Sequence, residues 1–258
     1  MFQLNKWYLD LVADDGTAFV GYRARLRWGA ITVSWASALH GSPGSPPVET
    51  VSLGNPGTIG VEDGVGSWVE PTLGVEGRWE GTAPPVHQTL WQEPGGVIDW
   101  SGLLPSARAV VQLGTTRLEG HGYLEHLTLT LRPWQLPFDT LRWGRYATAQ
   151  HAVTWIGWEG ETSRQWIWLN GGLCPDARLT TDGVAGLPDG ITLQLGTPRA
   201  LRQRRVLDTI TAHLPAVASR LEEKLSGLQE HKKVSPTALL QHGQVVDQGW
   251  AIHEEVRW

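Results

Sequence analysis

The chain has 258 residues and a net charge of −5, and its 21 lysine and arginine residues are dispersed, which excludes the basic footprint of a nucleic-acid-binding protein. Its single cysteine, Cys174, excludes a disulfide framework and a cysteine-based metal site, and suits a reducing compartment. Because the first residues lack the features of a signal peptide, and no apolar run approaches the roughly 20 residues that span a bilayer, the sequence predicts a soluble cytoplasmic protein.

The first three quarters of the chain consist of short runs that alternate between apolar and polar residues and are separated by glycine turns. Residues 7–28 predict a hairpin with its turn at residues 14–16, and residues 152–170 predict a second one with its turn at residues 159–163. Residues 41–58 are rich in Gly, Pro and Ser and predict a long loop. So many short strands at this spacing are typical of β-barrels or sandwiches.

The spacing of apolar residues along the chain changes near the C-terminus. Between residues 200 and 228, apolar residues recur at intervals of three and four, which predicts one amphipathic helical segment packed on a barrel. Pro215 predicts a kink in it, and Gly227 suits its C-terminal cap. Residues 243–258 predict a closing hairpin whose last strand completes a barrel.

Tryptophan is unusually abundant, with 15 residues against three Phe and four Tyr. An indole ring combines a large apolar surface with one N–H donor, and its face attracts cations. This composition is compatible with the packing of a β core. It is equally compatible with the lining of a site for a sugar, a lipid or a cationic intermediate.

The segment GHGYLEH, residues 120–126, contains the main candidate site. Successive side chains of a strand point to opposite faces, so His121, Tyr123 and Glu125 share one face. One interpretation is a polar face exposed to solvent. The other is an inward-facing acid in a Trp-lined cavity, where burial favours the protonated form of Glu125 and suits it to general acid catalysis. The flanking glycines predict a close approach by another segment.

The other candidate residues are weaker evidence for a functional site. Trp143 and Arg145 alternate onto one face of the predicted strand 140–147, where Arg145 is suited to a structural salt bridge. Trp7 and Asp10, in the first strand, are expected to be structural, with Asp10 bonding at a barrel rim. The histidine spacing matches no common metal motif, and the sequence lacks GxSxG, P-loop and GxGxxG motifs.

Three segments resemble, in order, motifs of the hydroxyneurosporene synthase or carotenoid 1,2-hydratase family and its AttH-like relatives. They are KWYLDLVADDG at residues 6–16, GHGYLEH at residues 120–126 and LRWGR at residues 141–145. They correspond to that family's WWYxD…DG opening, GxGYxDxN central motif and W-x-W-x-R strand. In this chain Glu125 replaces the usual Asp and Leu127 replaces the Asn, and no histidine lies near Trp100.

The resemblance implies a mainly β fold of two lipocalin-like antiparallel β-barrels. We expect residues 1–130 to form the N-terminal barrel, and residues 131–258 to form the C-terminal barrel with the helical segment. The family's catalytic Tyr and acid map onto Tyr123 and Glu125, and an upstream Trp maps onto Trp100.

Members of the family hydrate isoprenoid double bonds or prenyl groups, catalyse cyclisations, or bind lipids. The first hypothesis is therefore acid-catalysed hydration, cyclisation or isomerisation of an apolar isoprenoid or polyene-like molecule, without a cofactor or metal. Catalysis is assigned to Glu125, Tyr123 and His121, and substrate binding to Trp100, Trp143, Asp99 and His126. A non-enzymatic carrier of apolar molecules is the alternative, and a sugar-binding module is less favoured because no clear carboxylate pair is evident. Transient contact with a membrane surface and the oligomeric state are left open.

Overall fold

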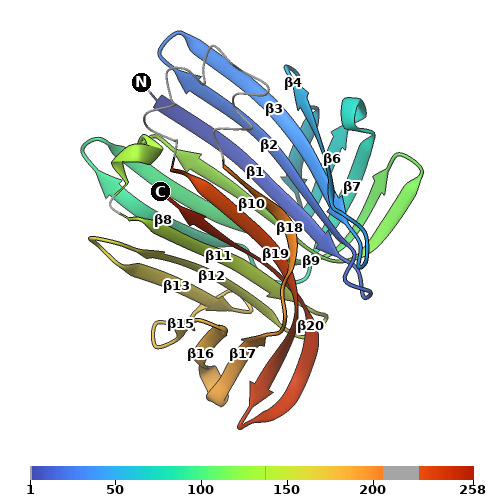
Figure 1. The fold of residues 1–258 in the computed structure, drawn as a ribbon, viewed down its shortest axis with the longest axis vertical. Helices are drawn as coiled ribbons and strands as arrows, with labels where there is room; N and C mark the ends of the chain where they lie inside the picture. Colours follow the sequence, from blue (N-terminus) through green and yellow to red (C-terminus); the bar gives the residue numbers. More distant parts are fainter. Residues whose placement is uncertain (1, 137, 206–226) are drawn as a thin grey trace. The chain divides into compact units, whose positions relative to one another are not determined.

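Residues 2–136, 138–205 and 227–258 are described by a computed structural model, in which they form two ten-stranded antiparallel sheets (Figure 1). Two compact units correspond to them, one of residues 1–132 with 147–152 and the other of residues 133–146 with 153–258. The first sheet contains β1 (Phe2–Val12), β2 (Ala18–Trp28), β3 (Ile31–Gly41), β4 (Val48–Leu53), β5 (Thr58–Glu62), β6 (Val65–Glu70), β7 (Val75–Gly81), β8 (Val86–Glu93), β9 (Gly96–Leu113) and β10 (Thr116–Leu129).

The second sheet contains β11 (Thr140–Ala147), β12 (Ala152–Glu159), β13 (Arg164–Leu169), β14 (Gly172–Leu173), β15 (Arg178–Thr180), β16 (Gly183–Leu187), β17 (Ile191–Leu195), β18 (Arg199–Arg205), β19 (Gln229–Gln241) and β20 (Gln244–Arg257). Three short 3-10 turns, η1 (Pro71–Leu73), η2 (Pro133–Gln135) and η3 (Pro188–Gly190), complete the described elements. The mainly β, curled antiparallel architecture predicted from the sequence is confirmed.

The two sheets have the same strand order. The first runs β4-β3-β2-β1-β10-β9-β7-β6-β5, with β8 paired to β9. The second runs β14-β13-β12-β11-β20-β19-β17-β16-β15, with β18 paired to β19. Each sheet therefore places its first and last strands side by side at its centre, which brings segments far apart in the sequence into one ladder.

Two of the three predicted hairpins are confirmed, and three predictions need correction. Residues 243–258, predicted as a closing hairpin, contain the single strand β20, because the turn that joins it to β19 lies at residues 242–243. The β1–β2 and β12–β13 pairs are antiparallel neighbours, with Val12 opposite Ala18 in the first. The predicted loop 41–58 contains β4, which pairs with β3 because its Val and Thr residues suit a strand. The predicted helix does not begin at residue 200, since Arg199–Arg205 is β18, and residues 206–226 lie outside the described part of the chain.

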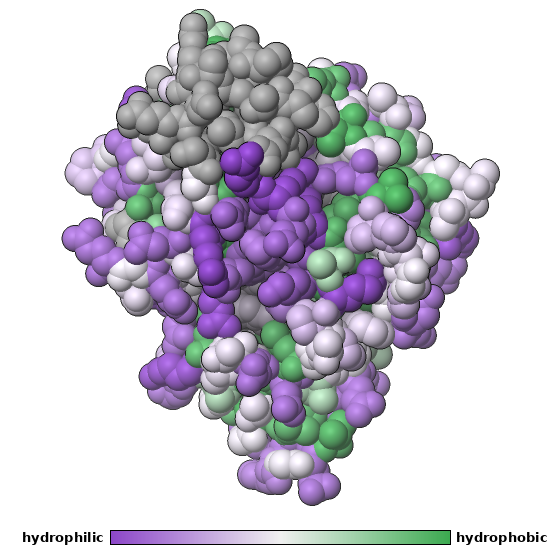
Figure 2. All heavy atoms as spheres, in the orientation of Figure 1, coloured by the Kyte–Doolittle hydropathy of each residue, from purple (hydrophilic) through white to green (hydrophobic). Residues whose placement is uncertain are grey.

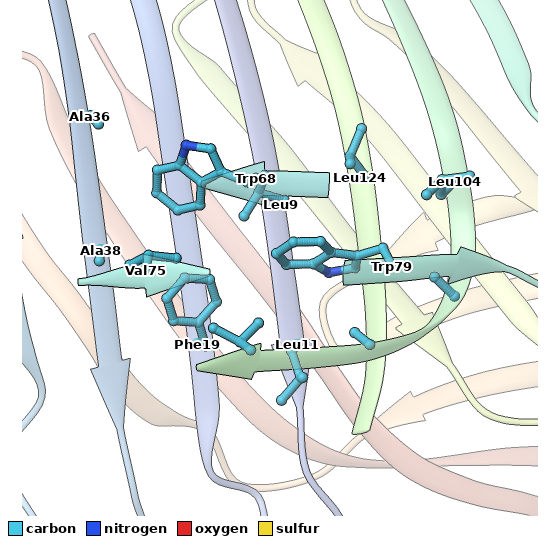
Figure 3. Packing of buried hydrophobic residues seen from close by; sticks show 13 residues of the cluster. Leu9, Leu11, Phe19, Ala36, Ala38, Trp68, Val75, Trp79, Leu104 and Leu124 are labelled. Carbon is cyan, nitrogen blue, oxygen red and sulfur yellow. The ribbon is translucent and has the colours of Figure 1, made fainter. Parts of the chain in front are cut away.

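The core of the first unit lies on one face of its curled sheet. Trp68, Trp79 and Phe19 are fully buried there, and Figure 3 shows their rings gathered around Leu9 and Leu11 of β1. Burial of such aromatic side chains stabilises by about 1.5–3 kcal/mol each relative to exposure. The hydrophobic packing that holds β1 in place therefore acts on the odd-numbered side of this strand.

The second unit has a separate core built from its own strands. The buried side chains that share it are those of Tyr146, Val153, Trp155, Ile167, Cys174, Ala177, Val184, Leu187, Ile191, Leu193, Leu239 and Ala251. On the surface, Figure 2 shows a face where hydrophilic side chains predominate, with smaller apolar areas between them. A search of the described residues for a helix long and apolar enough to cross a membrane gives none.

Candidate functional site

A row of buried polar side chains lies on β1 and β10, on the face opposite the core of their sheet. Along β1 and β10, Leu9 and Leu124 point into the core, so the alternating neighbours point the other way. The register places Tyr8 opposite Glu125 and Asp10 opposite Tyr123. All four polar residues are buried, and none of them is more than 4% exposed. They form the carboxylate row.

The first half of the carboxylate row is Glu125 with its two hydrogen-bond donors. Trp100 of β9 donates its indole N–H to Glu125 Oε2 at 2.5 Å, and Tyr123 donates its hydroxyl to the same oxygen at 2.8 Å. Two neutral donors therefore converge on one oxygen of this carboxyl group. Glu125 is 4% exposed, which excludes the solvated interpretation of the GHGYLEH strand.

The second half of the carboxylate row is Asp10 with Tyr8. The Tyr8 hydroxyl donates to Asp10 Oδ2 at 2.8 Å, and both residues are buried. The sequence predicts a structural role for Asp10 at a barrel rim, whereas the residue lies directly opposite Tyr123. The signal that could have found it is the Tyr-x-Asp spacing of residues 8–10, which repeats the Tyr-x-Glu spacing of residues 123–125.

Two glycines make room for this arrangement. A Cβ on Gly122 would lie 2.7 Å from Trp79 Cδ1 and 2.7 Å from the Asp10 carbonyl oxygen, so glycine lets the indole approach and donate to that oxygen at 2.7 Å. A Cβ on Gly102, opposite Glu125, would lie 3.1 Å from the Trp100 ring. The close approach predicted for the glycines of GHGYLEH is thus observed at Gly122.

Charged and titratable groups also border the carboxylate row. Lys6 lies on the same face of β1, with its Nζ 5.5 Å from the centre of the Tyr22 ring. Tyr22 in turn packs edge-on against Tyr8, with ring centres 5.2 Å apart. His121 shares the face of Tyr123 at the far end of the row and is half-buried, opposite the exposed Arg108.

Two predicted substrate contacts point to the other face of the sheet. His126 is opposite Trp7, with ring centres 4.7 Å apart, and burial lowers the pKa of His126. Asp99 alternates with Trp100 on β9 and accepts a hydrogen bond from the Thr89 hydroxyl at 2.7 Å. The structure therefore does not bring His126 and Asp99 together with Glu125, because adjacent strand residues point in opposite directions.

Trp143, the remaining predicted contact, belongs to the second unit, where it packs on a buried lysine. Lys232 Nζ lies 5.3 Å from the centre of the Trp143 ring, and the lysine also forms an ion pair with Glu254. Lys232 is fully buried, and its Cα partner across β19 and β20 is Glu254. Trp143 is thus placed to interact with a cation of the protein itself, a role that the sequence analysis missed.

A second ion pair extends this group across β18 and β19. Arg202 pairs with Glu230, and Arg204 Nε lies 3.7 Å from Glu230 Oε2. Burial raises the pKa of Glu230, but the positive charges of Arg202, Lys232 and Arg204 outweigh it and lower this pKa to about 2. Glu230 is therefore ionised in the folded protein at neutral pH, as is expected of a paired buried carboxylate.

No family model matches the chain, and curated proteins gave no match. The chain is similar to CghA in its complex with Sch210972, at 13% identity and TM-score 0.56 over 99% of this chain and 88% of that one. It is also similar to kievitone hydratase from Nectria haematococca, at 10% identity and TM-score 0.54 over 98% and 88% of the two chains.

These likenesses concern the fold, and this chain shares with CghA and kievitone hydratase the kind of fold that the three sequence motifs implied.

Proposed function

We propose that this protein is an enzyme that protonates a carbon–carbon double bond of an apolar, isoprenoid or polyene-like small molecule. Glu125 is the proton donor, and the outcome is hydration, cyclisation or isomerisation. The observation that carries this proposal is the convergence of the Trp100 and Tyr123 donors on one oxygen of a buried carboxyl group. An acid kept from bulk water and oriented in this way can give its proton to a bound substrate.

The neighbours of Glu125 suit the charge that this chemistry creates. Protonation of an alkene leaves a cationic carbon, and the Trp100 ring is held beside the acid by its own N–H···O bond. A desolvated indole face stabilises a cation by about 2 kcal/mol. Tyr123 keeps the carboxyl oriented, while His121, two residues along the same face, is suited to position the substrate. The fold shared with a protein named as a hydratase supports the general kind of reaction.

The test is product formation in deuterium oxide. The purified chain is incubated with individual linear isoprenoid alkenes and polyenes, such as squalene and lycopene, and the products are analysed by mass spectrometry. We expect deuterium at carbon in the product of the wild-type protein. Glu125→Gln should lower the rate by about 10²–10⁴-fold, because an amide cannot supply a comparable proton.

A matched control lies on the same strand. Glu119 is paired with Arg117 at the surface, with 61% of its side chain exposed, so Glu119→Gln should leave the rate unchanged. If Glu125→Gln were as active as the control, Glu125 would not be the acid. If the wild-type protein retained the apolar compounds without incorporating deuterium, the carrier alternative would replace the enzymatic one.

A further inference from the structure

We infer that Asp10 is the second catalytic carboxylate of the same site and acts as the base when Glu125 acts as the acid. This inference rests on the proposed function and narrows it. A site with one acid and one base suits the addition or elimination of water, or the shift of a double bond. It does not suit a cyclisation without net proton transfer.

The two carboxyl groups are diagonal neighbours on one face of the β1–β10 ladder. Tyr8 lies opposite Glu125, and Asp10 lies opposite Tyr123. Diagonal positions in such a ladder are about 7–8 Å apart, within reach of one small substrate group. Each carboxyl group accepts a hydrogen bond from the tyrosine two residues before it, so the two halves repeat the same unit in antiparallel directions.

Burial couples the protonation of the two carboxyl groups. Asp10 is 0% exposed and Glu125 is 4% exposed, so ionisation of one carboxyl disfavours ionisation of the other. Among the described residues of β1, β2, β9 and β10, this face also carries Lys6 and Tyr22 at one end of the row and His121 and Arg108 at the other, with Glu119 and Arg117 further along β10. A pair that shares one proton can release a proton at one position and accept one at the other.

Hydration illustrates the balance of the reaction. The O–H bond of the Glu125 carboxyl breaks, and the alkene π electrons form a C–H bond with that proton, which leaves a cation on the adjacent carbon. Water forms the C–O bond, and Asp10 takes one of its protons. The proton then returns from Asp10 to Glu125, and the hydroxyls of Tyr8 and Tyr123, each bonded to one of the two carboxyl groups, are the groups suited to carry it. In isomerisation, Asp10 instead takes a proton from the carbon next to the cation, where the new double bond forms.

The coupling can be tested without a substrate. Carboxyl ¹³C resonances of labelled protein are followed against pH in the wild-type protein, Asp10→Asn and Tyr8→Phe. We expect the Glu125 resonance of the wild-type protein to titrate in two steps. In Asp10→Asn it should titrate in one step at lower pH, because a neutral amide no longer opposes the Glu125 charge. Asp176→Asn, at an exposed position of the second unit, should leave the Glu125 titration unchanged.

Activity then tests the role of the base. In the deuterium oxide assay Asp10→Asn should lower turnover by about 10²–10⁴-fold while the protein still retains the alkene. Tyr8→Phe keeps the ring and its packing against Tyr22, so it provides a second variant if Asp10→Asn fails to fold. Tyr8→Phe should slow turnover, because it removes the hydroxyl that is suited to carry the proton from Asp10 back towards Glu125.

The outcomes separate the two proposals. An unchanged Glu125 titration in Asp10→Asn, or full activity of that folded variant, would overturn the role of Asp10 and leave Glu125 as the acid. A wild-type product that is a cyclised isomer without solvent deuterium would instead overturn both proposals, because neither carboxyl group would have transferred a proton to or from carbon. The proposed function itself would fail if Glu125→Gln were as active as the Glu119→Gln control, whatever the result for Asp10→Asn.

Discussion

Replacement of Glu230 by glutamine tests the buried charge network of the second unit. Glu230 pairs with Arg202. The Arg202 side chain is only 7% exposed and the Glu230 side chain only 10% exposed. The pKa of this carboxyl falls from its ordinary 4.5 to about 2, since burial, which raises it, is outweighed by the charges of Arg202, Lys232 and Arg204. The folded state therefore holds the ionised form more strongly than the unfolded state does.

The size of the effect follows from that difference. A fall from 4.5 to about 2 corresponds to about 3 kcal/mol of stability, at 1.36 kcal/mol per pKa unit. For a lowered carboxyl pKa this contribution is complete above about pH 4.5 and is lost as the pH falls towards 2. Glu230→Gln should therefore reduce the free energy of unfolding by about 3 kcal/mol or more at neutral pH, because Arg202 loses its buried counter-charge.

Urea unfolding followed by tryptophan fluorescence measures this difference, at neutral pH and again close to pH 2. The gap between the wild-type protein and Glu230→Gln should shrink in acid, because Glu230 is then protonated in the unfolded state and partly protonated in the folded state. Glu255→Gln is the matched control, since Glu255 on β20 pairs with Arg257, whose side chain is 64% exposed. That control should cost less than about 1 kcal/mol. Equal stability of Glu230→Gln and the wild-type protein at neutral pH would refute the reasoning.

Three further predictions concern single side chains. Burial, together with neighbouring lysine and arginine charges, lowers the pKa of His253 to about 4, so stability should fall as the pH drops from 6.5 towards 4. His253→Gln should flatten that slope in thermal melts. Gly122→Ala places a Cβ 2.7 Å from Trp79, and should cost about 1–3 kcal/mol and speed hydrogen exchange at the Trp79 indole. Trp7→Ala should lower the melting temperature through a loss of up to about 3 kcal/mol, since Trp7 packs on the core and on His126; an unchanged melt would contradict it.

The features that the sequence predicted well are local ones. The turn at residues 14–16 and the alternation on either side of it define the β1–β2 hairpin without information from the rest of the chain. In the same way, the two-residue period places Tyr123 and Glu125 on one face. Sequence period alone does not show which face is buried, and here the row and the core occupy opposite faces of the same strands.

The features that the sequence missed depend on pairing between distant strands. Asp10 joins Glu125 only because the first and last strands of the sheet, β1 and β10, are neighbours. Similarly, Lys232 meets Glu254 through the β19–β20 ladder. Arg199–Arg205 continued an apolar spacing typical of a helix, but its pairing with β19 overrides that local preference and brings Arg202 to Glu230.

The shared strand order of the two sheets places two corresponding glutamates, Glu125 and Glu254, in different electrostatic surroundings. Gly120 precedes Glu125 on β10 by the same spacing as Gly249 precedes Glu254 on β20. Across the ladder Glu125 faces Gly102, whereas Glu254 faces Lys232. The glycine leaves Glu125 open to the neutral donors of Trp100 and Tyr123, while the ammonium group of Lys232 forms an ion pair with Glu254. In this repeated scaffold, the residue on the adjacent strand therefore decides whether the glutamate meets neutral donors or a cation.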